Sequence, residues 1–353
     1  MDAKTSLRNP SDFIASGLVP PAQAAAAEAA SARQPLAIGP ALLAAIDAAD
    51  AADPIARQFV PSAEELEVLE EEMADPIGDH RHSPIKGIVH RYPDRVLLKP
   101  IPVCPVYCRF CFRREDVGPD GETLTPAELE AALDYIRARP EIWEVILSGG
   151  DPLLLSPRRL RDIVRSLDRI PHVGVIRIHT RVPVAAPERI DGDLIAALEA
   201  DDSALYVAIH CNHARELTPA ARHACRDLAR AGIPLLAQTV LLKGVNDDAA
   251  VLEALFRALV RNRVRPYYLH HPDLVRGTGH FRPGLETGQA LMRALRGRLS
   301  GLCQPTYVLD IPGGHGKAPV GPGYLAKDAT GGWQVEDYRG ETHAYPPAPP
   351  KAG

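Results

Sequence analysis

The sequence predicts an α/β fold, a partial barrel of parallel strands with a helical segment before it and an extension after it. From residue 95 onward, short apolar runs alternate with longer amphipathic ones, for example EVILSGG followed by SPRRLRDIVRSLDRI. Strands followed by helices of this length indicate a parallel sheet with right-handed crossovers. Six or seven such units in the chain are typical of a full or partial barrel.

Polar and glycine-rich residues follow the apolar runs at the point where each run ends. They occur in the stretches CPVYC, SGGDP, HTRVP, HCNH, HHPD and DIPGGHGK. In barrels of parallel strands, the carboxyl ends of the strands carry the reactive groups. We therefore expect these stretches to meet at one end of the barrel and to form the functional site.

We expect three parts in the 353-residue chain: an N-terminal helical segment at 1–90, the barrel at 91–325, and an extension with a tail at 326–353. The first part is rich in alanine and contains SAEELEVLEEEM, where Glu65 follows Ser62 by three positions. This capping-box pattern predicts a helix. The alanine-rich stretches fit either helices packed on the barrel or weakly ordered surface helices.

The overall charge and hydropathy pattern exclude several classes of protein. Lys and Arg number 40 against 45 Asp and Glu, and this net charge of −5 gives no electrostatic case for a nucleic-acid partner. No apolar run approaches the roughly 20 residues that a membrane helix needs. The start, MDAKTSLRNPSDF, lacks the apolar core of a secretory signal. We therefore expect a cytoplasmic protein without a membrane partner.

Three of the six cysteines lie within eight residues, in the run CPVYCRFC. A structural zinc site usually takes four ligands, whereas three thiolates on a 4Fe–4S cluster leave one iron free for an external molecule. We predict a 4Fe–4S cluster on Cys104, Cys108 and Cys111, with zinc or coincidence as the alternative. The isolated cysteines are interpreted as small buried hydrophobic residues: Cys211, Cys225 and Cys303.

The stretch DIPGGHGKAP places Lys317 after three glycines within four positions. It is not a phosphate-binding P-loop, because Ile311 stands where the first glycine is needed and Ala318 replaces Ser or Thr. A lysine on a flexible loop at a strand end can instead bond to the aldehyde of pyridoxal phosphate. From the residues alone, a solvated surface lysine is the alternative.

Together these motifs resemble the radical S-adenosylmethionine (SAM) superfamily, and within it the lysine 2,3-aminomutase family. The resemblance rests on CPVYCRFC, SGGDP, QTVLLKGVND, PYYLHHPD, GHFR and PGGHGK, and it extends from about Phe59 to about Tyr345. It implies a (β/α)6-type radical SAM barrel, a 4Fe–4S cluster, and SAM bound at the open iron. The residues that match SAM-binding positions are Ser148, Gly149, Gly150, Asp151, His210 and Gln238.

The resemblance also implies pyridoxal 5′-phosphate as a cofactor, carried by Lys317. In HRYPDR, Arg91, Tyr92 and Arg95 match the residues that contact its phosphate. Guanidinium groups suit this role because they bind phosphate bidentately. Alternatively, HRYPDR is only a charged stretch that precedes the first strand and binds no ligand. The family loop usually reads PGGGGK, so His315 replaces one glycine here.

For the substrate, the resemblance assigns Arg113 to the carboxylate of an α-amino acid, and the pair Asp273 and Asp310 to a side-chain ammonium. Two carboxylates repel an acidic substrate side chain. A neutral substrate side chain would leave the two carboxylate charges without a partner. Both positions are acidic here, so we expect L-lysine rather than glutamate. The alternative to substrate binding is a purely structural role, in which Asp273 caps a turn and Asp310 ends a strand.

The resemblance implies an L-lysine 2,3-aminomutase, an isomerase that moves the α-amino group of lysine to the β-carbon and gives β-lysine. The alternatives are the same chemistry on another amino acid, formation of β-lysine for modification of elongation factor P, and an inactive iron–sulfur binding or regulatory protein. The resemblance also implies an electron donor such as flavodoxin or ferredoxin. No cysteine follows Cys303, so we expect no structural zinc, and a homodimer is one option for the assembly.

Overall fold

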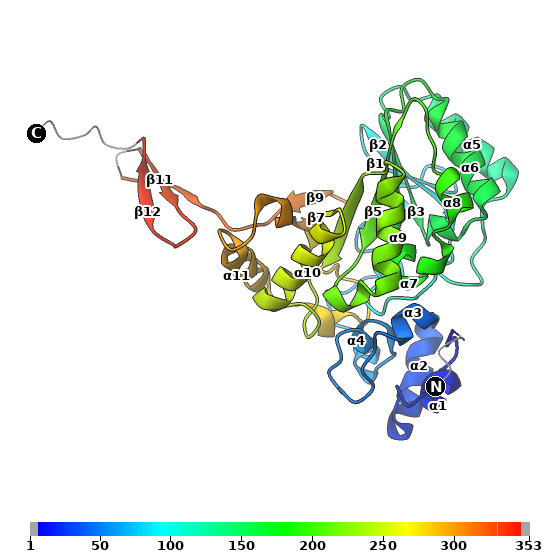
Figure 1. The fold of residues 1–353 in the computed structure, drawn as a ribbon, viewed down its shortest axis with the longest axis horizontal. Helices are drawn as coiled ribbons and strands as arrows, with labels where there is room; N and C mark the ends of the chain where they lie inside the picture. The colour runs from blue at the N-terminus through cyan, green and yellow to red at the C-terminus, as the bar shows by residue number, and fades with distance from the viewer. Residues whose placement is uncertain (1–5, 330, 347–353) are drawn as a thin grey trace, which may run out of the picture.

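The computed structural model describes residues 6–329 and 331–346. A nine-stranded sheet with the strand order β1 to β9 curls around a central space, and helices cover its outer face (Figure 1). β2 to β8 run parallel, whereas β1 and β9 pair antiparallel with β2 and β8 at the two edges. The strands are β1 (Ile88–Tyr92), β2 (Arg95–Ile101), β3 (Glu144–Gly149), β4 (Val175–Thr180), β5 (Ala204–His210), β6 (Leu235–Val240), β7 (Val264–His270), β8 (Thr306–Asp310) and β9 (Lys317–Pro319).

Helices occupy every crossover between consecutive parallel strands, so the partial (β/α)6-type barrel predicted from the sequence is confirmed. The crossover helices are α5 (Pro126–Arg137), α6 (Pro157–Asp168), α7 (Val182–Ala185), α8 (Gly192–Ala196), α9 (Pro219–Arg230), α10 (Ala249–Arg261) and α11 (Leu285–Leu295). Their apolar faces and the strands form one continuous core. This rigid frame holds the ends of the parallel strands in fixed positions.

Three crossover helices begin with the same local chemistry. Thr125, Ser156 and Thr218 each accept a backbone N–H of the first turn through their hydroxyl oxygen, and each is followed by proline. Proline suits the first helical position because its missing N–H would have no partner there. The motifs TPAELE, SPRRLR and TPAARH therefore fix where these helices begin.

The N-terminal segment forms short helices with a small core of its own below the barrel in Figure 1. Phe13, Leu42 and Phe59 in this core pack with Val106, which belongs to the cysteine-containing loop after β2. The segment therefore packs on the barrel as an integral part of it. Its helices are α1 (Pro10–Ala15), α2 (Ala24–Arg33), α3 (Pro40–Leu43) and α4 (Ala56–Phe59).

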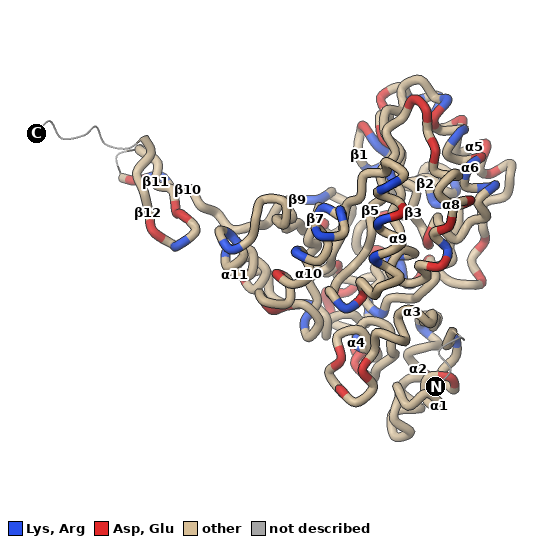
Figure 2. The backbone as a smooth tube through the Cα atoms, in the orientation of Figure 1, with Lys and Arg blue, Asp and Glu red and all other residues tan. Residues whose placement is uncertain are grey.

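The helix predicted for SAEELEVLEEEM was wrong in extent. Only one 3₁₀ turn forms, at Ala63–Leu66, and the chain is extended from Glu67. Glu65 does accept the Ser62 backbone N–H at 3.1 Å, as the capping pattern predicts. Its carboxylate is also buried against two arginines of the barrel, and this tertiary contact replaces helix propagation. Acidic residues gather in the segment after α4 (Figure 2).

After β9 the chain leaves the barrel and forms a separate antiparallel sheet that projects from the body (Figure 1). Its strands are β10 (Leu325–Lys327), β11 (Trp333–Glu336) and β12 (Thr342–Tyr345). Leu325 and Tyr345 are 64% and 65% exposed, so this sheet contributes little to the barrel core. The tail predicted for ETHAYPPAPPKAG, residues 341–353, begins instead with a strand, β12, and residues 347–353 lie outside the described residues.

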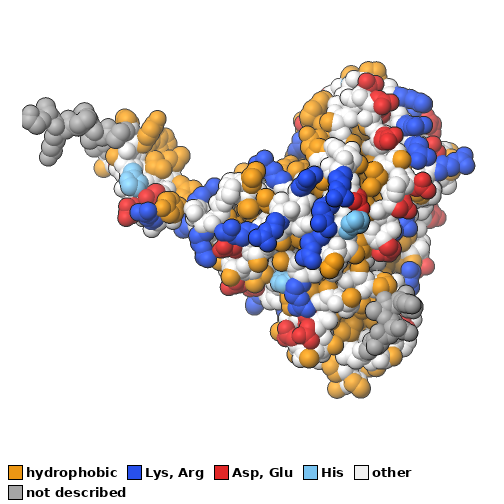
Figure 3. All heavy atoms as spheres, viewed as in Figure 1, with side chains coloured by type: hydrophobic (Ala, Val, Ile, Leu, Met, Phe, Trp, Pro, Cys, Tyr) orange, Lys and Arg blue, Asp and Glu red, His pale blue; other side chains and the backbone are white. Residues whose placement is uncertain are grey.

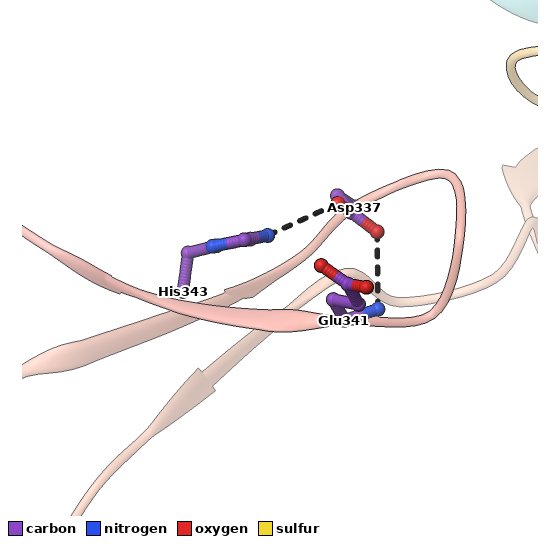
Figure 4. A group of neighbouring side chains, drawn as sticks. All are labelled: Asp337, Glu341 and His343. Carbon is purple, nitrogen blue, oxygen red and sulfur yellow. Dashed lines mark hydrogen bonds and ion pairs between the residues drawn. The ribbon is translucent and has the colours of Figure 1, made fainter.

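At the tip of this sheet, Asp337, Glu341 and His343 lie close together (Figure 4). The Asp337 carboxylate accepts the Glu341 backbone N–H at 3.0 Å and pairs with His343 Nε2 at 3.0 Å. These contacts close the turn between β11 and β12, and the imidazole lowers the pKa of Asp337. Hydrogen bonding within the turn therefore accounts for this cluster.

Among the described residues, no helix is long and apolar enough to cross a membrane. On the face shown in Figure 3, basic side chains gather over α9 and α10 and acidic side chains are interspersed among them.

Candidate active site

A cavity of about 580 Å³ lies inside the curled sheet and reaches the carboxyl ends of its parallel strands. Its wall is formed by the cysteine-containing loop, the strand ends, and the start of β9 after the glycine-rich loop. Every residue that the sequence suggested for a cluster, cofactor or substrate lies on this wall. The fold therefore gathers at one site residues that are spread from Arg91 to Lys317 in the chain.

The loop after β2 is held in place by the N-terminal segment. The Tyr107 backbone N–H donates to the Ala37 carbonyl at 3.2 Å, and the Arg109 N–H donates to the Gln58 carbonyl at 2.8 Å. These bonds fix a short, irregular stretch of chain that has no strand or helix of its own. The loop carries three free thiols on the cavity wall: Cys104, Cys108 and Cys111.

The surroundings of the three thiols disfavour their ionised form. Burial and neighbouring anionic groups raise the pKa of Cys104 well above its usual value, and they raise the pKa of Cys111 to about 11. Burial also raises the pKa of Cys108, although the Arg181 guanidinium partly opposes this effect. Three thiolates placed this close together would therefore require a positively charged metal centre between them, which a 4Fe–4S cluster would supply.

Two arginines of the same loop share one buried carboxylate from the N-terminal segment. Arg109 and Arg114 each place a guanidinium nitrogen on Glu65 Oε2, at 2.6 Å and 2.8 Å. The Arg109 and Glu65 side chains are 0% and 1% exposed. Removing one partner from such a pair leaves an uncompensated buried charge, which costs about 3–5 kcal/mol. This ion-pair network fixes the spacing between Cys108 and Cys111.

The glycine-rich element at the end of β3 packs directly beneath the cysteine-containing loop. Gly149 has a φ of +105°, and a Cβ at Gly150 would lie 2.4 Å from the Val103 carbonyl oxygen. Only glycine permits this approach. Asp151 is buried, and its carboxylate accepts the Thr180 hydroxyl and the Arg181 backbone N–H, both at 2.7 Å. Asp151 thus connects this element to the end of β4.

Three polar residues line the cavity at the ends of β4, β5 and β6. Gln238 Nε2 and His179 Nε2 lie 3.0 Å apart, and the His179 ring contacts the His210 ring edge-on. Burial lowers the pKa of His179 well below its usual value and, with help from nearby arginines, the pKa of His210 to about 3. Both imidazoles are therefore neutral, so this wall offers hydrogen bonds without charge.

Lys317 is the first residue of β9, and its side chain turns into the cavity. Its backbone N–H donates to the Tyr92 hydroxyl at 2.7 Å, and its Nζ lies 2.5 Å from Asp310 Oδ2. Gly316 before it has a φ of +92°, and a Cβ there would lie 3.1 Å from the Tyr92 hydroxyl. His315 is exposed, so the position that departs from the family loop points away from the cavity.

Arg91, Tyr92 and Arg95 lie opposite Lys317. The Arg95 guanidinium stacks on the Tyr92 ring at 3.8 Å, and Arg91 Nη2 donates to Asp79 at 3.0 Å. The Arg91 Nε is buried and has no partner among the described residues. A buried donor without a partner costs about 1–3 kcal/mol, so this guanidinium retains capacity for an anionic ligand. The group fits a phosphate.

Asp273 and Asp310 form a coupled pair of carboxylates beside Lys317. Burial and the Asp310 carboxylate raise the pKa of Asp273 to about 7. Asp310 is buried, and besides Lys317 it has Arg91 Nη1 at 3.4 Å. Lys317 and Arg91 both pair with Asp310, whereas no cation of the described residues forms an ion pair with Asp273, which leaves this carboxylate for a ligand ammonium.

Arg113 reaches the cavity from the end of the cysteine-containing loop. Its Nε donates to Asp79 Oδ2 at 2.7 Å and its Nη1 donates to the Ser148 hydroxyl at 3.2 Å. Burial alone would raise the pKa of Asp79, but the Arg113 guanidinium holds it below its usual value. Asp79 thus fixes both Arg113 and Arg91, so the two proposed anion-binding side chains share one buried anchor.

Several residues in the site were not predicted individually. His179, Arg181 and His270 line the cavity from HTRVP and HHPD, stretches whose position at strand ends already indicated function. Asp79 lies in an irregular part of the N-terminal segment, where no periodicity or spacing marks it. Only the tertiary contact with Arg113 identifies it.

Comparison with known proteins defines first the class of protein. A sequence profile of the radical SAM superfamily matches residues 98–255, which span β2 to the middle of α10. Together with the barrel and the three-cysteine loop, this makes the chain a radical SAM enzyme, a class that uses a 4Fe–4S cluster and SAM.

Three relatives narrow the assignment. The chain is 43% identical over 290 residues to the L-lysine 2,3-aminomutase of Clostridium subterminale, covering 82% of this chain and 70% of the relative. It is 42% identical over 311 residues to a putative L-lysine 2,3-aminomutase of Aquifex aeolicus, covering 88% and 84%. It is 39% identical over 294 residues to the glutamate 2,3-aminomutase of Clostridioides difficile, covering 83% and 69%.

A profile described as lysine-2,3-aminomutase matches residues 292–351. This chain belongs to the lysine 2,3-aminomutase family.

Proposed function

We propose that this chain converts L-lysine to β-lysine and uses pyridoxal phosphate in addition to the cluster and SAM. When bound, the cluster and SAM supply a carbon radical that removes a hydrogen atom, and pyridoxal phosphate supplies an aldehyde that holds the migrating nitrogen. The observation that carries the substrate is the presence of two carboxylates, Asp273 and Asp310, on the cavity wall beside Lys317. An ε-ammonium between these carboxylates would neutralise charge that a glutamate side chain would increase.

The remaining site residues receive roles that their contacts support. The cysteines Cys104, Cys108 and Cys111 would hold the cluster, and Arg113 would pair with the substrate carboxylate in the orientation that Asp79 imposes. The residues that we propose for pyridoxal phosphate are Lys317, Arg91, Tyr92 and Arg95. The residues that we propose for SAM are Ser148, Gly149, Gly150, Asp151, His210 and Gln238.

Within the proposed SAM site, Asp151 acts by positioning the neighbouring strand ends and not by accepting a hydrogen bond from SAM. Its carboxylate already accepts Thr180 and Arg181, so we propose that it positions the ends of β3 and β4 around the ligand. The neutral imidazole of His210 can donate or accept one hydrogen bond without adding charge near a sulfonium. The His210 imidazole therefore adds no charge that would repel a positively charged ligand at this wall.

Product analysis tests the proposal directly. Reconstituted protein is incubated anaerobically with L-lysine, SAM, pyridoxal phosphate and a chemical reductant, and chromatography then measures β-lysine. A second incubation with L-glutamate is the competing arm, since the family includes a glutamate 2,3-aminomutase. Turnover of glutamate in place of lysine would contradict the role of Asp273 and Asp310.

The assignment of the 4Fe–4S cluster is tested by Cys108→Ala. We expect this variant to lose iron and sulfide while its circular dichroism stays that of the folded barrel. An unchanged 4Fe–4S spectrum would contradict the cluster assignment. A wild-type protein that loads the cluster but forms no product from lysine, arginine, ornithine or glutamate would support the inactive alternative.

Several further expectations belong to the same proposal. We propose a low-potential electron donor of the flavodoxin or ferredoxin type, a cytoplasmic location, and a homodimer as the assembly to test. The division of the chain at residues 90 and 325 also stays a prediction. Limited proteolysis near residues 320–325 would test the second boundary.

A further inference from the structure

One buried cation contacts the cysteine-containing loop and has no part in the proposed binding of substrate or pyridoxal phosphate. Arg181 follows β4, and its Nη1 donates to Cys108 Sγ at 3.1 Å. Its backbone N–H is fixed by Asp151 at 2.7 Å. Cys108 is the only cluster cysteine for which the described residues show such a side-chain hydrogen bond.

The Arg181 guanidinium is buried and carries a defined counterion. Its side chain is 7% exposed, and its Nη2 lies 2.6 Å from Glu216 Oε2 and 3.0 Å from Gln58 Oε1. Glu216 is 0% exposed, and its other oxygen accepts the Asn212 N–H at 2.8 Å. Cys108, Arg181 and Glu216 therefore form a chain of alternating charge when Cys108 is a thiolate.

Two aromatic rings pack near the Arg181 guanidinium, and one of its nitrogens has no hydrogen-bond partner in the described part of the chain. The ring centres of Phe59 and Phe110 lie 4.8 Å and 5.6 Å from the guanidinium carbon and cover part of its surface. The Nε is buried and has no partner among the described residues. In such an environment the charge of Arg181 acts on the sulfur with little screening.

We infer that Arg181 is a redox-tuning residue, which raises the reduction potential of the 4Fe–4S cluster through Cys108 Sγ, and that Glu216 limits this effect. This inference rests on the proposed cluster site. Reduction adds one electron from an external low-potential donor to the cluster, and no bond at Arg181 forms or breaks. A cation and a hydrogen bond at a ligand sulfur stabilise the more negative, reduced state.

The inference predicts shifts of opposite sign from the two partners. Arg181→Met removes the cation and lowers the midpoint potential. Glu216→Gln removes the counterion, leaves more net positive charge near Cys108, and raises the midpoint potential. We expect each variant to change the reduction equilibrium at least tenfold, which is about 59 mV for a one-electron couple.

The experiment is a redox titration of the reconstituted full-length protein, with the reduced cluster measured by electron paramagnetic resonance and dithionite as the reductant. Arg189→Met is the matched control, because Arg189 lies in the same segment and donates only to the carbonyls of Leu153, Leu154 and Leu155. Its potential should equal that of the wild type. Arg181→Lys, which keeps the charge, should lie between the wild type and Arg181→Met.

Three results would overturn the inference. The first is an unchanged potential in Arg181→Met, and the second is a shift in the same direction in both Arg181→Met and Glu216→Gln. If Arg181→Met does not load a cluster, unchanged potentials in Arg181→Lys and Glu216→Gln would show that Arg181 is structural only. A wild-type protein that loads no 4Fe–4S cluster would instead contradict the proposed function.

Discussion

The cysteine end and the lysine end of the cavity differ in how their charges are paired. At the cysteine end, Arg109 and Arg114 share the single carboxylate of Glu65, which comes from the N-terminal segment. At the lysine end, Lys317 pairs with Asp310, and the pKa of Asp273 is raised to about 7 by burial and by that neighbour. The ion pairs at the cysteine end are almost fully buried, whereas the Lys317 side chain at the other end is 30% exposed.

This difference distinguishes ion pairs that stabilise the fold from charged groups that are available to bind a ligand. The partners at the cysteine end come from segments far apart in the sequence, so their pairing stabilises the tertiary structure around the cluster loop. The partners at the lysine end, where Asp310 pairs with Lys317 and Arg91, all belong to the cavity wall, and no cation of the described residues forms an ion pair with Asp273. Substitutions at the first end should therefore reduce stability, and substitutions at the second end should reduce binding.

The largest effect is expected from breaking the cysteine end with Glu65→Gln. Two buried arginines lose their counterion, which costs about 3–5 kcal/mol. We expect loss of most bound iron and a clear decrease in thermal stability, measured by iron and sulfide content and by calorimetry. Glu64→Gln is the control, because the Glu64 side chain is 51% exposed and should change neither quantity. Full cluster loading in Glu65→Gln would contradict the structural role of this end.

At the lysine end, Lys317→Ala should abolish product formation while leaving stability near that of the wild type. We expect activity to fall on the order of 10³-fold or more, with loss of the absorption band of protein-bound pyridoxal phosphate. Lys327→Ala, in the exposed strand β10, serves as the control. An unchanged pyridoxal phosphate spectrum in Lys317→Ala would remove the cofactor role of this residue.

Asp273→Asn should weaken lysine binding by a smaller factor. The loss of one charge-assisted hydrogen bond is worth about 1.5–3 kcal/mol, so we expect the KM for lysine to rise roughly 10- to 150-fold. The wild-type KM should also rise as the pH falls below about 7, because Asp273 becomes protonated there. A KM that is flat between pH 6 and pH 8 would argue against recognition by this carboxylate.

The smallest expected effect is a gain in stability from Asp273→Asn, in contrast to the losses expected from the substitutions above. Because the pKa of Asp273 is raised to about 7 from 3.8, the native state binds more protons than the unfolded state between these values. Its stability contribution is therefore present at low pH and is lost as the pH rises through about 7. Asp273→Asn should raise the Tm at pH 8 by about 2 °C or more. A decrease in Tm would show that the charged carboxylate stabilises the fold.

Much of this architecture could be predicted from the sequence because local rules agree with the tertiary structure. The Ser/Thr-Pro pairs fixed the starts of α5, α6 and α9, and the strand-end motifs face one cavity. The roles of those site residues stay predictions that the experiments above test.

The contacts that sequence patterns do not reveal are long-range and electrostatic. Glu65 satisfies a helix-capping pattern, yet its carboxylate binds Arg109 and Arg114, and the predicted helix stops after one turn. Asp79 lies in an irregular segment and is 34 positions from Arg113 in the chain. No local periodicity reports a partner at that distance, so only the structure could identify it.

The ion pair between Lys317 and Asp310 has a consequence for the order of events in the cavity. The ammonium of Lys317 occupies one of the two carboxylates that we assign to the substrate side chain. Any movement of Lys317 toward another group leaves Asp310 and Asp273 facing each other without it, a state that an arriving side-chain ammonium relieves. The chain thus contains an internal surrogate for its substrate, and one lysine leaves the carboxylate pair as another takes its place.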